Sequence, residues 1–567
     1  MTSRETPLSS TRRSVLRGAG VVLATTATTA ATTAGAHARP AVRPSAATPP
    51  LPRTPFTLGV ASGDPEPDGF VLWTRLALEP LADDGRGAMP ARRYDVKWEI
   101  GTDDRMRRVV RRGTVSAGPE TAHAVHVEVT GLNPGREYWY RFRVGRWTSE
   151  TGRTLSAPAR GVMPSSLAMS FVSCSQFEHG WFTAYRRLAE DRPDLVLHLG
   201  DYQYEYAQGD YVADSGNVRD HRGPETVDLA GYRQRYAQYR TDPDLRAAHA
   251  VAPWLAVFDD HEVDNNWARF TPEHPEDQAG FRQRRRAAFR AYYENQPLRR
   301  TSMPHGPYIQ AYRRRHWGEL ATFHVLDTRQ FRDDQACDDG YDACPAASDP
   351  KRSITGATQE AWLLDGFRES RARWDLISQQ VFFAQRDSDA GPNTVTSMDA
   401  WDGYTASRDR ITKGFVDAGV RNPVVLTGDV HAHWGSDLYD DYAADSPRTV
   451  GSELVTSSIT SGGDGYDSPT GEHPWFPQNP NLRFWTNLRG YVNTTITPDS
   501  LSADYRVVPK VSVKDQPALT RATYAIEDRR PGLQQVSSTP VPSPLRAATP
   551  RSDAEIIRDT IGTAGTV

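Results

Sequence analysis

The 567-residue chain contains four short apolar runs that each end in side chains able to bind metal ions. One such run ending in Gly-Asp is more often a plain turn, but four in one chain favour a site. In α/β sheets the loops at the carboxyl ends of the strands build the functional site, so these four ends would meet. They carry Cys174 after SFVS, Asp201 after LVLHLG, Asp259 to Glu262 after LAVF, and Asp429 and His431 after VVLTG. Thiolate, carboxylate and imidazole groups at one edge predict a metal centre.

The elements that would position these side chains read as an α/β domain over residues 167–530. Apolar runs such as 195–201 alternate with helix-like stretches such as 357–374. This alternation predicts a layered α/β fold. Residues 56–160 differ, because short alternating runs separated by turn clusters predict a small all-β sandwich of fibronectin or immunoglobulin type.

The two ends of the chain read as a targeting segment and a tail. Arg12 and Arg13 fit a twin-arginine signal peptide over residues 1–38, whose apolar stretch is too short for a membrane anchor. Residues 39–55 read as a linker and 537–567 as a flexible C-terminal tail. We therefore expect a secreted protein that uses the twin-arginine export machinery and has no transmembrane segment.

Charge and cysteine usage narrow the functional class. The formal net charge of −4 argues against a nucleic-acid-binding module, which would usually be basic. Outside the cell, Cys337 and Cys344 in the loop CDDGYDAC are expected to form a local disulfide. Cys174 is then left as a free thiol, either a buried apolar residue or a metal ligand.

The motifs resemble those of the calcineurin-like metallophosphoesterases. The superfamily's G-D-x-x-Y block is Gly200 to Tyr204, its third block is DDHE over 259–262, and its last is Gly428 to His431. Cys174 stands where the first block has D-x-H. This departure, with the stretches LGVASGDP, VLWTR, FDDHEVDNNW and LDTRQ, is similar to a narrower group of PhoD-type alkaline phosphatases and iron-dependent phospholipases D. The resemblance covers about residues 54 to 530 and implies a two-sheet sandwich flanked by helices.

This resemblance implies two metal positions that share Asp201 as a bridging carboxylate. The first combines thiolate, phenolate, carboxylate and imidazole, and its three anionic donors favour Fe³⁺. Its ligands are Cys174, Asp201, Tyr204 and His431. The second has carboxylate oxygens where other members use nitrogen, which favours Ca²⁺. Its ligands are Asp260, Asp429 and the carbonyl of either Asn265 or Asn266.

The same resemblance implies hydrolysis of phosphate esters by a metal-activated water or hydroxide, with Asp201 and Asp429 as catalytic metal-holding groups. His261 is the candidate general acid and also a substrate-binding residue; the alternative is a structural histidine oriented by Asp259. His433 either binds the substrate phosphate or caps its loop.

Three functions stay open at this point. The first is an exported phosphomonoesterase of the alkaline phosphatase type. The second keeps the metals but cleaves diesters, including phospholipid head groups as a phospholipase D does. Nothing in the motif residues separates these two. The third is a non-catalytic surface protein whose β-sandwich binds a polymer or partner, and the intact ligand set argues against it.

Overall fold

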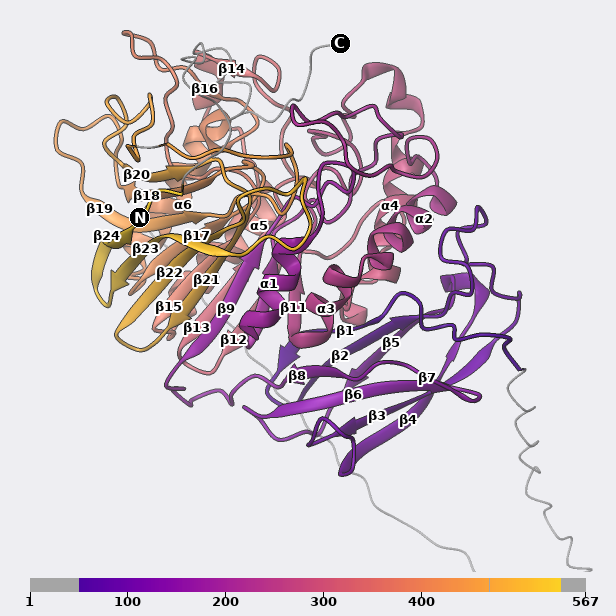
Figure 1. Ribbon diagram of the computed structural model, residues 1–567. Coiled ribbons are helices and arrows are strands. Elements are labelled where there is room, and N and C mark those ends of the chain that lie inside the picture. The colour runs from indigo at the N-terminus through magenta and orange to yellow at the C-terminus, as the bar shows by residue number, and fades with distance from the viewer. Residues whose placement is uncertain (1–49, 469, 542–567) are drawn as a thin grey trace, which may run out of the picture. The chain divides into compact units, whose positions relative to one another are not determined.

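The computed structural model describes residues 50–468 and 470–541 and is drawn in Figure 1. The predicted signal peptide, residues 39–49 of the predicted linker and residues 542–567 lie outside the described residues. No helix among those described is both long and apolar enough to cross a membrane.

The N-terminal region is built of two facing β-layers. One is an antiparallel sheet in the order β4-β3-β6-β7, in which β8 also pairs with β6. Its strands are β3 (Tyr94–Gly101), β4 (Val109–Ala117), β6 (Glu137–Val144), β7 (Trp147–Thr148) and β8 (Gly152–Leu155). The other layer contains β1 (Val60–Glu66), β2 (Gly69–Arg75) and β5 (Ala124–Val129). Side chains of both layers, among them Leu72 and Phe142, form one apolar core.

The second of these layers is also the end of a larger sheet. β1 pairs in parallel with β11 (Pro253–Ala256), with Ser62 opposite Pro253 and Gly63 opposite Trp254. All seven residues of β2 are buried, as expected of a strand covered on both faces. The sandwich predicted over 56–160 therefore shares a layer with the domain predicted over 167–530. Its immunoglobulin-like character stays a prediction.

Two mixed sheets lie face to face, and the larger one includes β1, β2 and β5. The ten-stranded sheet has the order β24-β23-β22-β21-β9-β10-β11-β1-β2-β5, and the seven-stranded sheet β12-β13-β15-β17-β19-β18-β20. Phe171 and Leu197 of the first share a core with Phe323 and Val424 of the second. The strands not yet given are β9 (Leu167–Val172), β10 (Leu195–His198), β12 (Arg313–Trp317), β13 (Ala321–Val325), β15 (Trp374–Ser378), β17 (Pro423–Thr427), β18 (His433–Tyr439), β19 (Thr449–Val455), β20 (Leu482–Thr486), β21 (Gly490–Ile496), β22 (Ser500–Val507), β23 (Leu519–Glu527) and β24 (Arg530–Ser538).

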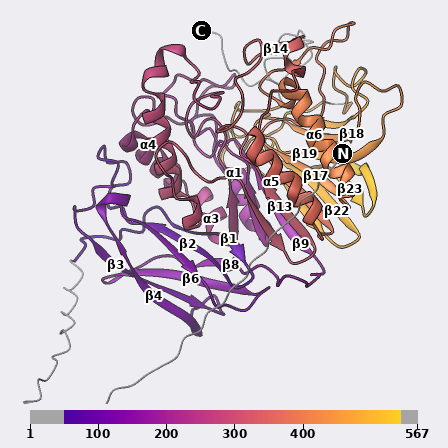
Figure 2. The same cartoon turned by 180° about the vertical axis from the view of Figure 1, so that it is seen from behind.

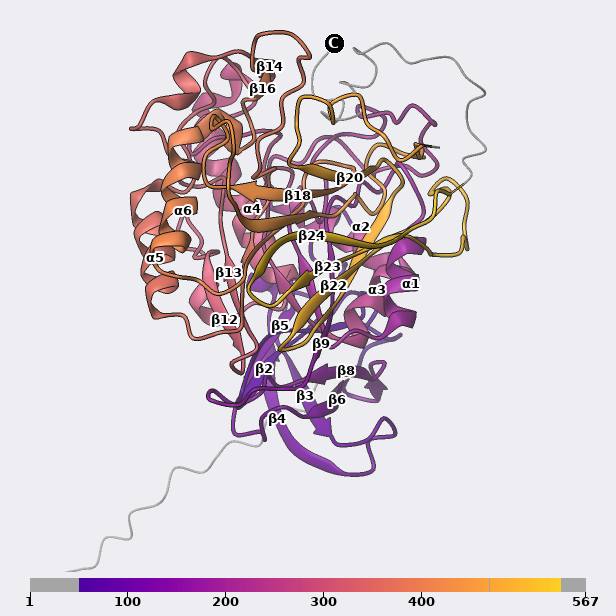
Figure 3. The same cartoon turned by 90° about the vertical axis from the view of Figure 1, so that its left-hand side faces the viewer.

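Helices cover the outer faces of the two sheets. Figures 2 and 3 show α5 and α6 together over the seven-stranded sheet, and Figure 3 shows α1 and α3 on the opposite side. The apolar faces of α5 and α6 supply Phe367 and Phe415 to a core shared with Ile377 and Val425 of that sheet. The helices are α1 (Thr183–Asp191), α2 (Leu229–Thr241), α3 (Pro243–Val251), α4 (Phe281–Asn295), α5 (Gly356–Glu369) and α6 (Thr405–Asp417). This arrangement is the predicted layered α/β fold.

Short elements complete the chain. A two-stranded sheet pairs β14 (Tyr341–Asp342) with β16 (Thr396–Ser397). The 3₁₀ turns are η1 (Pro119–Thr121), η2 (Pro275–Ala279), η3 (Arg300–Ser302), η4 (Pro345–Ser348) and η5 (Trp401–Tyr404).

The last strand corrects the predicted start of the C-terminal tail. β24 runs to Ser538 and pairs with β23, so the limit predicted at 537 falls inside a strand. Leu533 is buried, and its backbone N–H donates to Asp437 Oδ1 of β18 at 2.7 Å. This contact holds the segment on the fold although its composition is that of a loop.

Candidate metal centre

The carboxyl ends of β9, β10, β11 and β17 meet at one edge of the two sheets. β9, β10 and β11 are neighbouring parallel strands of the ten-stranded sheet, whereas β17 belongs to the seven-stranded sheet. The Cys174 N–H, just past β9, donates to Gly200 O just past β10 at 3.1 Å. The predicted ligands therefore come together because each follows one of these ends.

The backbone turns sharply at the predicted ligands. Cys174, Asp201, Asp429 and His431 have φ angles of 60°, 55°, 60° and 56°, in the left-handed region that side chains other than glycine rarely adopt. Such residues cost about 1–3 kcal/mol each and concentrate at functional sites. Gly200 makes the turn before Asp201 possible, since a Cβ there would lie 2.4 Å from the Asp259 Cβ.

Four of the predicted ligands form a first group. Ligand atoms of Cys174, Asp201 and His431 all lie within 4.8 Å of one another. The Tyr204 hydroxyl lies 3.0 Å from Asp201 Oδ2 and 3.2 Å from His431 Nε2, and it accepts a hydrogen bond from Ser461 Oγ at 2.7 Å. All four side chains are buried, apart from slight exposure of His431. The structure thus brings together a thiol, a phenol, a carboxyl and an imidazole.

A second group of oxygen donors adjoins the first. Ligand atoms of Asp259, Asp260 and Asp429 lie within 4.8 Å of one another, and Asp260 also groups with Asp201 and His261. Asp201 and Asp260 therefore connect the two groups.

The two asparagines predicted as alternative ligands both line the pocket at this centre. Asn265 Nδ2 donates to Glu273 Oε1 and Asn266 Nδ2 donates to Asp339 Oδ2, each at 2.7 Å. The amide oxygen of each residue is therefore the atom left for a cation.

The chemistry of these groups fits bound metal ions. Asp201 Oδ1 and Asp260 Oδ1 are buried without a hydrogen-bond partner. Burial, and then the neighbouring Asp260 carboxylate, raises the pKa of Asp201 well above its usual value. Burial and Asp259 do the same to the pKa of Asp429. Buried carboxylates that repel one another and keep unused oxygens are stabilised by cations.

Arg329 contacts the second group, and reasoning from the ends of the strands did not predict it. Its Nε donates to Asp259 Oδ1 at 2.6 Å, and its Nη1 donates to Asp399 Oδ1 at 2.9 Å. Its Nη2 lies 3.5 Å from both Asp260 Oδ1 and Asp429 Oδ1. The guanidinium therefore neutralises part of the second group. Its position in the motif LDTRQ was the available signal.

His261 is oriented by a carboxylate other than Asp259, the one considered in the sequence. Its Nδ1 lies 2.9 Å from Glu205 Oε2, whereas Asp259 pairs with Arg329. Burial lowers the pKa of His261, but Glu205, Asp260 and Asp201 outweigh it and raise this pKa well above its usual value. The ring also lies against Tyr204, with centroids 4.0 Å apart. His261 therefore lines the pocket beside three carboxylates, those of Glu205, Asp260 and Asp201.

The position of His433 corrects its prediction as a substrate-binding residue. It begins β18, is fully buried, and its Nδ1 accepts a hydrogen bond from the Ser457 N–H at 3.0 Å. Its ring packs edge-on against Tyr505, and it is absent from the described lining of the pocket. Six of the seven residues of β18, His433 among them, are buried, so its ring lies in the interior.

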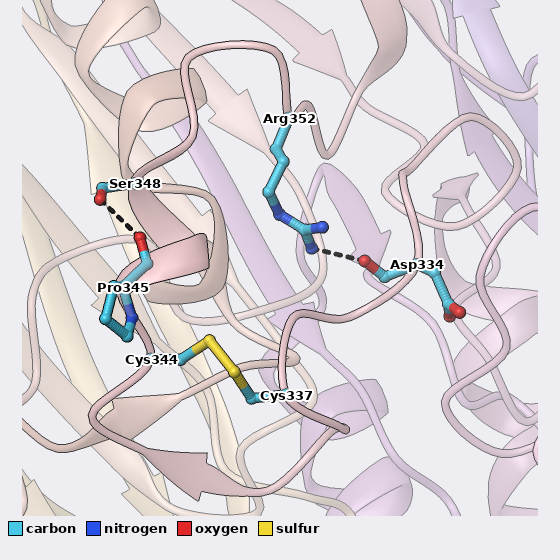
Figure 4. Close-up of a disulfide and its surroundings, with 6 residues drawn as sticks. All are labelled: Asp334, Cys337, Cys344, Pro345, Ser348 and Arg352. Carbon is cyan, nitrogen blue, oxygen red and sulfur yellow. Dashed lines mark hydrogen bonds between the residues drawn. A yellow bond between two sulfur atoms is a disulfide. The ribbon is translucent and has the colours of Figure 1, made fainter.

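A disulfide-closed loop forms another wall of this pocket. The structure pairs Cys337 with Cys344, as Figure 4 shows, while Cys174 stays a free, buried thiol. Asp339 and Tyr341, between the paired cysteines, line the pocket together with the predicted metal ligands. The loop is thus part of the site.

Comparisons with known proteins agree with this geometry. The sequence model of the PhoD-like phosphatase family matches residues 168–505, and that of the PhoD-like phosphatase N-terminal domain matches residues 41–158. The chain is 46% identical over 488 residues to alkaline phosphatase D of Bacillus subtilis (strain 168), covering 86% of this chain and 83% of that protein. A solved structure titled "Structure of PhoD" superposes with a TM-score of 0.87 at 44% identity, covering 91% of this chain and 98% of the other. The predicted family is confirmed: the chain belongs to the PhoD-like phosphatases.

Proposed function

We propose that the protein is an exported alkaline phosphatase that holds Fe³⁺ in the first ligand group and Ca²⁺ in the second. The observation that carries this proposal is the meeting of Cys174, Tyr204, Asp201 and His431 at one point beside a group of carboxylates. Anionic sulfur and phenol donors suit a trivalent iron, and carboxylate and amide oxygens suit calcium. The twin-arginine pattern of the sequence supports export.

The chain's own residues then have distinct roles. When bound, the cations supply positive charge to the phosphate oxygens and lower the pKa of a water molecule. Asp201, Asp260 and Asp429 hold those charges in place. His261, protonated and oriented by Glu205, donates a proton to the leaving alcohol oxygen.

A side-by-side assay tests the substrate class. A phosphate monoester, a bis-aryl diester and phosphatidylcholine are offered to protein loaded with iron and calcium, with phosphate or alcohol release measured. We expect the monoester to be hydrolysed fastest and calcium chelation by EGTA to abolish the activity reversibly. Faster cleavage of the diester or the lipid would redirect the proposal to a phosphodiesterase or a phospholipase D.

A pair of variants distinguishes loss of the metal centre from a general loss of structure. Asp201→Asn is expected to lose bound metal by elemental analysis together with activity. Asp210→Asn changes an exposed aspartate of the same segment and should keep both. Full activity in Asp201→Asn would refute the assignment of the centre.

A further inference from the structure

Arg386 is a buried cation at the edge of the candidate site. It is 5% exposed, and no ion pair joins it to a carboxylate in the part of the chain that the structure describes. Its Nη2 donates to the Tyr341 hydroxyl at 2.7 Å, and its Nη1 is buried without a partner. A buried charge without a counter-ion is costly, so an anion from outside the chain would be favoured here.

The surroundings of Arg386 distinguish it from the rest of the pocket. Among the described residues that line the pocket it is the only lysine or arginine, whereas five aspartates line the same space. Its guanidinium lies 4.4 Å from the ring centre of Phe382, 5.3 Å from that of Trp434 and 5.5 Å from that of Trp475. Aromatic rings hold a guanidinium by its face and leave its N–H edge for an acceptor.

The loop closed by the disulfide fixes the position of Arg386 relative to the candidate metal centre. Tyr341, the hydrogen-bond acceptor of Arg386, lies in the loop closed by Cys337 and Cys344 (Figure 4) and pairs with Ser397 through β14 and β16. Asp339 of the same loop accepts the hydrogen bond from Asn266. One covalently closed segment therefore contacts both the predicted calcium-binding segment and Arg386.

We propose that Arg386, positioned by Tyr341, binds an oxygen of a phosphate group of the substrate. The inference rests on the proposed phosphatase function and adds a specificity-determining residue to it. A guanidinium offers two parallel N–H donors that match phosphate oxygens. The bound group is either the phosphate being cleaved or a second phosphate on the same substrate.

Steady-state kinetics on a matched pair of substrates tests the proposal. Glucose 6-phosphate carries one phosphate and glucose 1,6-bisphosphate carries two. In Arg386→Met we expect KM to rise about tenfold to a hundredfold, the loss typical of a charge-assisted contact, while kcat changes far less. Arg386→Lys should recover part of the loss. A rise for both substrates assigns the contact to the cleaved phosphate, and a rise for the bisphosphate alone assigns it to the neighbouring one.

Two further variants separate binding from folding. Arg314→Met removes another arginine stacked on a tryptophan, 4.6 Å from the Trp362 ring and outside the pocket, and should leave KM unchanged. Tyr341→Phe should raise KM severalfold without lowering the melting temperature by more than a few degrees. If Arg386→Met does not fold, the KM values of Tyr341→Phe and Arg386→Lys test the role of Arg386 instead.

Different results would overturn the role of Arg386 and the proposed phosphatase function. A wild-type enzyme that hydrolyses both sugar phosphates while Arg386→Met or Tyr341→Phe keeps KM within twofold overturns the role of Arg386 and leaves the phosphatase proposal standing. A metal-loaded wild type that hydrolyses no phosphate ester overturns the proposed function itself. The inhibition constant of inorganic phosphate should rise in parallel with KM if the cleaved phosphate is bound.

Discussion

Replacing Glu262 by glutamine tests how the backbone beneath the candidate metal centre is held. The buried Glu262 carboxylate accepts three backbone hydrogen bonds: Oε2 from Asp201 N at 3.1 Å and from Asp259 N at 2.8 Å, and Oε1 from Tyr202 N at 2.7 Å. One side chain thus fixes the turns that follow β10 and β11. These turns carry ligands of both groups.

The size of the effect follows from these three contacts. A glutamine oxygen can replace Oε2 and keep two bonds, but its NH₂ group then faces the Tyr202 N–H, donor against donor. A hydrogen bond to a charged group contributes about 1.5–3 kcal/mol and one between neutral groups about 0.5–1.5 kcal/mol. Burial raises the pKa of Glu262 to about 8, so the comparison is made at pH 9, where this carboxyl is ionised. Losing one bond and weakening two, offset in part by removing a buried charge, should then lower the free energy of unfolding by about 2–4 kcal/mol.

Urea unfolding of metal-stripped protein, followed by circular dichroism, measures this change. Glu190→Gln is the matched control, because the Glu190 side chain is 54% exposed and pairs with Arg187 on the same helix; its effect should stay below about 0.5 kcal/mol. We also expect Glu262→Gln to bind less iron and calcium, since Asp201 would lose its fixed turn. Unfolding within about 0.5 kcal/mol of wild type would refute the role given to this carboxylate.

Two further predictions concern the ligand Tyr204 and the ion cluster around Asp64. Tyr204→Phe should remove the visible absorption expected of a phenolate bound to Fe³⁺, and an unchanged band in the iron-loaded variant would exclude Tyr204 as a ligand. Burial raises the pKa of Asp64, but Arg313, whose Nε lies 2.8 Å from it, Arg315 and Arg299 outweigh burial and lower this pKa. Its stabilisation is therefore present above about pH 4 and lost as the pH falls through the folded-state pKa. Asp64→Asn should cost about 3–5 kcal/mol at pH 7 and about 1 kcal/mol less at pH 3 in urea unfolding, and an equal loss at both pH values would contradict this.

The sequence predicted that the candidate ligands lie together because their positions depend on strand topology. Parallel strands bring their carboxyl ends to one edge, so a polar residue directly after an apolar run has a defined place without any knowledge of side-chain packing. Cys174, Asp201 and His431 are examples, and the three-residue spacing placed Tyr204 beside them. His433, for which phosphate binding and loop capping both stayed open, lies inside β18 instead of in the loop.

Residues that act through other residues could not be predicted in this way. Glu205 contacts His261 and Arg329 contacts Asp259, and both come from segments that are distant in sequence or irregular in structure. Their roles depend on which side chain faces which after folding. The pairing of β1 with β11 could not be predicted for a related reason, because strand pairing across nearly 200 residues leaves no local pattern in the sequence.

The predicted ligands and the residues that support them are linked by a balance of energies at the centre. Four predicted ligands hold left-handed backbone, and burial and neighbouring carboxylates raise the pKa of Asp201 and of Asp429, so a centre without cations would oppose folding. Bound cations would relieve the repulsion but not the backbone strain, which needs contacts that persist without metal. The Glu262 carboxylate supplies these beneath Asp201, and Arg489 Nη1 supplies one by donating to the backbone oxygen of His431. The proposed ligands would therefore determine which ion is bound, whereas the geometry of the centre depends on Glu262 and Arg489, which lie outside the proposed ligand set.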